Sequence, residues 1–362
     1  MKDDIEKKAQ EFLDLADVKI NGNRPWDIKV NNPRLYSRVI AGGSLDLGES
    51  YMDGWWDCNA IDQLADRILR ARLQKKVRGT KHRIWLVLKS KLINMQSRSR
   101  AYEVGGRHYD IGNDFYKLML DKRMTYSCGF WDNAQTLDEA QEAKLKISCE
   151  KLGIKPGMTV LDIGCGWGSF VKYAAEQYDV KKIVGITISK KQAEIAEERC
   201  KDFNNVEIRV QDYRNLDEQF DRIISIGMME HVGYKNYRKY MEVARKCLKP
   251  DGRFLLHTIG GNTSVKAIDP WINKYIFPNA VLPSAKQITT AAEGLFTLED
   301  WHNYGLNYDK TLMAWHSNFI KGWDQIKDHY SERFRRMWEY YLLCYAGTFR
   351  SGMNQLWQIM FL

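Results

Sequence analysis

The residues that point most directly to chemistry are three glycines, at positions 164, 166 and 168, which follow the apolar run 158–163. Helix-compatible sequence resumes after them, so a strand, a glycine turn and a helix follow in order. This order brings backbone N–H groups and a helix N-terminus close to a nucleotide-like ligand, and a Cβ there would hold the ligand away. The turn alone leaves two alternatives open. It could belong to a dinucleotide-binding fold, although its spacing departs from G-x-G-x-x-G, or it could bind no ligand.

The elements around this turn alternate between strands and helices. Apolar runs predict strands at 159–163, 182–187, 205–211, 220–226 and 252–258, and helical spacing predicts helices at 137–151, 169–178, 190–203 and 237–247. This alternation is typical of an α/β fold, in which helices cover both faces of a doubly wound, mostly parallel sheet.

Polar and small residues fall at the carboxyl ends of these predicted strands. Ligands of such sheets bind outside those ends, where the strand order reverses. We therefore expect one pocket to be lined by residues that span nearly a hundred positions: Gly164, Thr187, Gln211, Glu230 and His257.

Composition narrows the class of protein. A chain of 362 residues with 44% hydrophobic residues can hold one large core and a smaller domain. Seven cysteines without a C-x-x-C pair indicate neither a disulfide framework nor a zinc site, and they favour a reduced, cytoplasmic environment. The charged N-terminus is unlike a secretory signal, and no apolar run approaches the ~20 residues that span a bilayer.

The net charge of +9 suggests an anionic partner, and the segment 67–100 carries much of it. This segment holds about a dozen Lys and Arg, no Asp or Glu, and apolar residues between them at helical spacing. Such a helix can lie in a lipid headgroup layer. A nucleic-acid partner competes but lacks a recognisable binding motif, and a solvated helix packed on its own domain also fits.

Eight motifs together resemble one family in order and spacing. They are His108–Asp114, Tyr126–Cys128, Val160–Gly168, Gly185–Ser189, Gln211–Tyr213, Met229–Gly233, His257–Gly260 and Tyr308–Trp315. The chain resembles the bacterial cyclopropane-fatty-acyl-phospholipid synthases, which depend on S-adenosyl-L-methionine. The resemblance runs from near Trp26 to the C-terminus.

The resemblance implies a seven-stranded, Rossmann-like class I methyltransferase fold with a smaller, mainly helical N-terminal domain. We expect a lipid-docking domain at 1–82, a basic linker at 83–100 and a catalytic domain at 101–362. The insertion 269–295, which contains Pro and aromatic residues, is expected to supply a substrate lid.

The resemblance also implies which residues bind the co-substrate S-adenosyl-L-methionine. They are Tyr126, Ser127, Gly164, Cys165, Gly166, Gly168, Thr187, Ile188, Ser189, Gln192, Gln211, Asp212 and Tyr213. Many methyltransferases place an acidic residue at the end of the second strand for the ribose hydroxyls. Thr187 and Ser189, with Gln192, occupy that place here, and Ser189 also suits the N-cap of the next helix.

The reaction implied by the resemblance adds a methylene across a cis double bond of an acyl chain, through a carbocation that loses a proton. In this family a bound bicarbonate ion is the base. The matching residues are Cys128, Glu230, His257, Tyr308 and the main chain at Ile259. Considered alone, His257 is more simply interpreted as a structural histidine, and Cys128 as a small hydrophobic residue.

The implied partners are an anionic phospholipid membrane surface and an unsaturated phospholipid acyl chain, and the family suggests a homodimer. The expected place is the cytoplasm, peripherally at the inner face of the cell membrane, with no nucleic acid bound and no metal. Two other functions stay open. One is a methyltransferase that makes a methyl-branched or methylated small molecule, and the other is a membrane-binding scaffold that has lost activity.

Overall fold

The computed structural model describes residues 2–73 and 112–362. These residues form two compact units, and neither unit is continuous along the chain. The first unit contains residues 2–73, 267–278 and 308–354, and the second contains 112–266, 279–307 and 355–362. The predicted linker 83–100 and most of the basic segment 67–100 lie outside the described residues. Two segments of the predicted catalytic domain, 267–278 and 308–354, belong to the first unit.

The described part of the first unit is mainly helical, as predicted for the N-terminal region. Its elements are α1 (Lys2–Asp14), β1 (Lys29–Val30), α2 (Leu35–Gly42), α3 (Ser44–Met52), β2 (Trp56–Asp57), α4 (Ile61–Arg70), α14 (Pro270–Tyr275), nearly all of α16 (Gly305–Ile326), the 3-10 turn Lys327–His329, and α17 (Glu332–Arg350). Each of its two strands, β1 and β2, has only two residues, and they pair antiparallel. None of the described helices is long and apolar enough to cross a membrane.

Close packing and ion pairs join the separated segments of the first unit. A Cβ at Gly48 in α3 would lie 2.4 Å from the Trp271 ring in α14, so only glycine permits this approach. Arg350 at the end of α17 pairs with Asp62 in α4, at 2.6 Å, and with Asp309 in α16, at 2.8 Å. The N-terminal helices therefore depend on helices from the C-terminal third of the chain for their core.

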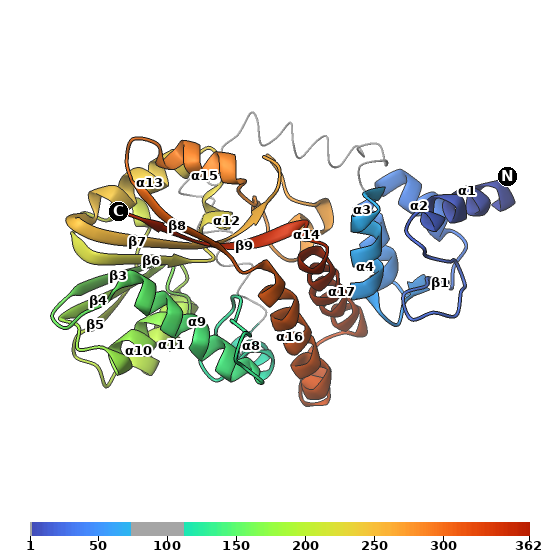
Figure 1. The fold of residues 1–362 in the computed structure, drawn as a ribbon. Coiled ribbons are helices and arrows are strands. Elements are labelled where there is room, and N and C mark those ends of the chain that lie inside the picture. The colour runs from blue at the N-terminus through green and yellow to red at the C-terminus, as the bar shows by residue number, and fades with distance from the viewer. Residues whose placement is uncertain (1, 74–111) are drawn as a thin grey trace. The chain divides into compact units, whose positions relative to one another are not determined.

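The second unit is built on a seven-stranded sheet, drawn in Figure 1. Its strands are β3 (Thr159–Ile163), β4 (Lys182–Thr187), β5 (Val206–Val210), β6 (Phe220–Ile226), β7 (Leu248–Gly261), β8 (Leu298–Asn303) and β9 (Asn354–Phe361). The order is β5-β4-β3-β6-β7-β9-β8. Pairs among β3 to β7 are parallel and β8 pairs antiparallel with β9, which confirms the predicted fold class.

Helices cover both faces of this sheet (Figure 1). The described helices of the second unit are α8 (Asn113–Met119), α9 (Leu137–Leu152), α10 (Ser169–Gln177), α11 (Lys190–Cys200), α12 (Met229–Val232), α13 (Tyr237–Lys246) and α15 (Ala285–Ala292), and a 3-10 turn spans Tyr213–Asn215. Successive strand residues alternate between two cores: Leu161 packs with α13 and α15, whereas Val160 packs with α9 and α10. The strands are thus buried on both faces, as parallel strands between helix layers must be.

The predicted bounds of three strands, 159–163, 182–187 and 220–226, match the structure. The observed strand β7 (Leu248–Gly261) is longer than the predicted strand 252–258. The predicted helix 190–203 ends earlier in the structure, at Cys200. The insertion 269–295 is divided between the units, with α14 in the first and α15 in the second. Its role as a lid stays a prediction.

Candidate active site

The three glycines lie directly after β3, and we call residues 164–168 the glycine edge. Gly164, Gly166 and Gly168 have φ angles of 93°, 55° and 78°, in the left-handed region that favours glycine. A Cβ added at Gly166 would meet no atom of the described residues within 4 Å. The positive φ angle is therefore what favours glycine at this position. The N–H groups of Gly164 and Cys165 donate to the carbonyl of Ile186 in β4, which fixes the turn to the sheet.

The glycine edge lies where the strand order reverses, since β3 has β4 on one side and β6 on the other. Ligands of doubly wound sheets bind outside the carboxyl ends at this point. In register, Ile163 stands beside Ile186, and Ile226 stands beside His257. The strand ends predicted to line one pocket therefore lie along one edge of the sheet.

The end of β4 is organised by hydrogen bonds among the predicted cofactor residues. The Thr187 hydroxyl donates to Gln192 Oε1 at 2.9 Å and accepts from the Ser189 N–H at 3.2 Å. Ser189 also caps α11, because its hydroxyl accepts from the Gln192 N–H, so the predicted capping role is confirmed. Ile188 lies between them, and the Gln211 N–H donates to the Thr187 carbonyl. These contacts hold the side chains of the β4 end in fixed positions.

A buried charged group lies behind the predicted residues Tyr126 and Ser127. The Lys144 ammonium on α9 is 1% exposed and donates to the Ser127 hydroxyl at 3.1 Å. Burial lowers the pKa of Lys144 and raises that of Asp162 at the end of β3, while their opposite charges counteract both shifts. The Tyr126 ring packs on Tyr116, with the ring centroids 5.3 Å apart. A positive charge thus holds the Ser127 loop beside β3.

Three other predicted cofactor residues have structural roles. Asp212 caps the 3-10 turn and pairs with Arg214 at 2.8 Å, and Tyr213 is buried in the core that α13 covers. The Cys165 thiol is buried, and burial raises its pKa well above the usual value. Their contact with a cofactor stays a prediction.

Glu230 lies in α12 and is 5% exposed. Its Oε1 accepts a 2.6 Å hydrogen bond from the Ile259 N–H in β7, while its Oε2, fully buried, accepts none from the described residues. Burial raises the pKa of Glu230 to about 7, against the lowering effects of its own N–H, the Ile259 N–H and the Thr258 hydroxyl. The Ile259 N–H, expected to donate to an anion, is here engaged by Glu230.

His257 lies two residues before Ile259 in β7 and is 1% exposed. Its Nδ1 is 3.3 Å from the Gln358 Nε2, and its Nε2 contacts no hydrogen-bond partner within the described part of the chain. Burial, followed by the charges of Lys144 and Lys151, lowers the pKa of His257 well below 6.5. The Phe130 ring stacks on His257, with centroids 6.1 Å apart. His257 is therefore a neutral, sequestered imidazole.

The remaining predicted catalytic residues are Cys128 and Tyr308. Cys128 is fully buried and its thiol donates to the Gly129 carbonyl at 3.1 Å, two residues before the Phe130 that stacks on His257. Tyr308 lies in α16 of the first unit, 8% exposed, and stacks on Phe349 with centroids 4.5 Å apart. The place of both residues around a bound anion stays a prediction.

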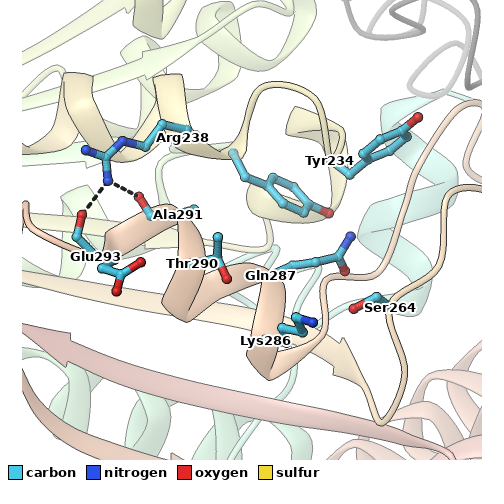
Figure 2. A pocket seen from close by; sticks show the side chains of 9 residues that line it. Tyr234, Arg238, Ser264, Lys286, Gln287, Thr290, Ala291 and Glu293 are labelled. Carbon is cyan, nitrogen blue, oxygen red and sulfur yellow. Dashed lines mark hydrogen bonds between the residues drawn. The ribbon is translucent and has the colours of Figure 1, made fainter.

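An open groove of about 620 Å³ lies between the segment that leads into α13 and helix α15. Figure 2 shows Arg238 donating to the carbonyls of Ala291 and Glu293 on one side of it, with Lys286 and Gln287 on the other. The groove is lined by Tyr234, Tyr237, Arg238, Ser264, Lys286, Gln287, Thr290, Ala291 and Glu293. It includes none of the predicted catalytic or cofactor residues, so it is distinct from the candidate active site.

A family model described as mycolic acid cyclopropane synthetase matches residues 96–359. The chain belongs to this family. It is 52% identical over 353 residues to the cyclopropane-fatty-acyl-phospholipid synthase of Escherichia coli strain K12, a match that covers 98% of this chain and 92% of that protein. The family resemblance and the enzyme class expected from it, an S-adenosylmethionine-dependent methyltransferase, are thereby confirmed.

Two solved structures show the same fold. The cyclopropane synthase MmaA2 from Mycobacterium tuberculosis is 32% identical, with a TM-score of 0.69, and the match covers 74% of this chain and 99% of that one. The mycolic acid cyclopropane synthase CmaA1 in complex with SAH and CTAB has the same identity and coverage, with a TM-score of 0.67.

Three residues of the site were missed by sequence reasoning: Lys144, Ser148 and Gln358. The Gln358 amide gave a signal, because it interrupts the apolar run 356–361 of a strand buried on both faces. The sequence contains no signal for Lys144 and Ser148. Helix α9 has a mixed composition, and its sequence does not distinguish a buried lysine from an exposed one.

Proposed function

We propose that this enzyme transfers a methylene group from S-adenosylmethionine to the cis double bond of unsaturated phospholipid acyl chains and closes a cyclopropane ring. The alkene attacks the sulfonium methyl as the carbon–sulfur bond breaks, which leaves a carbocation on the acyl chain. A proton then leaves the new methyl group while the second carbon–carbon bond forms. Family membership and the relatives named above support the reaction, and the glycine edge supports the co-substrate.

The observation that carries the proposed base is a pair of buried atoms, Glu230 Oε2 and His257 Nε2, that find no hydrogen-bond partner among residues 2–73 and 112–362. Buried polar atoms are satisfied in the large majority of cases. The Ile259 N–H ties Glu230 to β7, the strand that carries His257, so these two atoms suggest a polar group that completes them. Bicarbonate fits this pair, because its O–H can donate to a carboxylate oxygen and its other oxygens can accept from an imidazole N–H. When bound, bicarbonate supplies a base for the proton that the transferred methyl loses.

The residues of the chain would act on this group in complementary ways. A neutral His257 donates without adding a charge that would repel the carbocation. Glu230 accepts the O–H, and because its pKa is about 7 it can carry either protonation state near neutral pH. The stacked ring of Phe130 covers His257 and helps to exclude water, which would otherwise trap the cation as an alcohol.

The substrate resides in a bilayer, so we propose that the enzyme docks peripherally on an anionic leaflet, at the cytoplasmic face. The support is the basic pattern of 67–100. Arg67, at the start of this segment, pairs with Asp17 and lies over the Trp26 ring. Each basic residue near an anionic surface contributes about 1 kcal/mol. Co-sedimentation that is equal for anionic and zwitterionic vesicles, and insensitive to salt, would contradict this docking.

Mass spectrometry of phospholipids tests the reaction. After incubation of unsaturated vesicles with isotope-labelled S-adenosylmethionine, we expect acyl chains that have gained one CH2 unit and resist ozonolysis. A labelled chain that still reacts with ozone would mean a methyl- or methylene-branched alkene and would favour the alternative methyltransferase. Binding of the co-substrate without any labelled lipid would favour the scaffold.

A further inference from the structure

A chain of buried hydrogen bonds reaches His257 from α9. The Ser148 hydroxyl donates to the Lys144 carbonyl at 2.7 Å, and Gln358 Nε2 lies 2.9 Å from the same hydroxyl and 3.3 Å from His257 Nδ1. Ser148 and Gln358 have no exposed surface. The Gln358 amide nitrogen therefore lies within hydrogen-bond distance of both the Ser148 hydroxyl and the imidazole.

The orientation of the Gln358 amide follows from which of its polar atoms have hydrogen-bond partners. In the orientation described, both N–H donors have partners, and only Oε1 lacks one among the described residues. Rotation by half a turn would place the NH2 group, with two donors, where Oε1 now finds no partner. Two buried unsatisfied donors cost more than one unsatisfied acceptor, so the amide presents N–H to His257.

We propose that Gln358 is a positioning residue that fixes the tautomer of His257. Because Gln358 donates to Nδ1, that nitrogen must be the acceptor, and the single ring proton of the neutral imidazole resides on Nε2. An Nδ1–H tautomer would place two donors against each other in a buried space. Nε2, for which residues 2–73 and 112–362 supply no partner, is then a donor on the side of the ring away from Gln358.

This assignment rests on the proposed function and makes it more specific. With Nε2–H as a donor and Glu230 Oε2 as an acceptor, the site favours an anion that both accepts and donates hydrogen bonds. Bicarbonate has both capacities, whereas nitrate can only accept. The selection depends on Gln358, because the opposite tautomer would present a lone pair at Nε2 to the anion. The alternation of side chains along β9 places Gln358 on the α9 side of the sheet. Gln358 and Met360 face α9, whereas Ile359 faces α13.

The experiment measures the tautomer directly, by NMR of the full chain with isotope-labelled histidine ring nitrogens. The His257 signals are identified as those missing from H257N. We expect a protonated Nε2 and an unprotonated Nδ1 in the parent protein, and added bicarbonate should shift the Nε2 signal. An Nδ1–H tautomer in the parent would overturn the role of Gln358. The expected tautomer without any response to bicarbonate would support that role and contradict the proposed base.

The variant Q358M keeps the length of the side chain and removes its donors. We expect a mixture of His257 tautomers, a fall in kcat of about 10- to 100-fold and a KM for S-adenosylmethionine within about twofold of the parent's. The control Q355M changes a glutamine of the same strand whose amide donates to Asn262, and it should keep both the tautomer and kcat. Retention of the parent's tautomer and kcat by Q358M would overturn the proposal. S148A, which removes only the second acceptor, should move both readouts in the same direction but less.

Discussion

The glycine edge presents backbone at the end of β3, whereas the ends of β6 and β7 present buried side chains. The turn at 164–168 is shaped by positive φ angles and by the absence of Cβ atoms, with open space beside Gly166. Glu230 and His257 lie instead in a closed environment that shifts both pKa values. We propose that the first region selects a ligand by shape and the second by proton and charge. Substitutions in the two regions should therefore impair the enzyme in different ways.

The largest effect is expected from E230Q, which removes the buried carboxylate. A residue that holds or assists a general base contributes on the order of 100-fold or more, so kcat should fall at least that far. Affinity for S-adenosylmethionine, measured by calorimetry, should stay unchanged. The matched control is E242Q, on the exposed face of α13. Turnover of E230Q near the parent's rate would remove the role assigned to Glu230.

The opposite result, a loss of S-adenosylmethionine affinity, is expected from G166V at the glycine edge. A β-branched residue at a φ of 55° is strained, and its side chain fills the space that a ligand would use, so S-adenosylmethionine affinity should fall about 100-fold. The control G157V carries similar strain, because Gly157 has a φ of 78° and open space beside it, but it lies in the turn before β3. Equal losses of affinity in both variants would mean that strain alone is responsible.

The pH dependence of stability distinguishes the regions further. Burial raises the pKa of Glu230 from 4.5 to about 7, so the folded state retains a proton that the unfolded state releases. The resulting stability is fully present below pH 4.5 and is lost as pH rises through about 7. E230Q lacks this titration. Its unfolding free energy relative to the parent's should therefore rise by up to about 3 kcal/mol from acidic to alkaline pH.

Urea unfolding of both proteins at a series of pH values measures this difference. E242Q again serves as the control, because it makes the same change from carboxylate to amide at the surface of α13. Parallel profiles for E230Q and the parent would show that Glu230 titrates like an exposed carboxyl and would contradict its buried environment.

The smallest effect is expected from T187V at the end of β4. The change removes the hydroxyl that donates to Gln192 and accepts from Ser189, so Gln192 loses its fixed position. We expect the KM for S-adenosylmethionine to rise about 5- to 10-fold with kcat nearly unchanged, equivalent to about 1 kcal/mol. A fall in kcat at constant KM would assign Thr187 to the chemistry instead of to binding.

The same contrast explains what sequence could predict. Strands β3, β4 and β6 were predicted with their bounds because each is an apolar run limited by turn residues, and the glycine edge is a local pattern. The first unit was not predicted as it is built, because its core depends on contacts between distant segments, such as Gly48 with Trp271 and Arg350 with Asp62. Glu230 and His257 came from motif resemblance. Their unpartnered atoms, and the link from Gln358, are tertiary features without a sequence pattern.

The central claim is that Glu230 and His257 hold a bicarbonate ion that serves as the base. The most direct test is ring formation in buffer freed of dissolved carbon dioxide, followed by addition of bicarbonate, with nitrate at equal ionic strength as the control. We predict that the parent loses activity on depletion and regains it with bicarbonate but not with nitrate, whereas E230Q responds to neither. Undiminished ring formation by the parent without bicarbonate would contradict the claim.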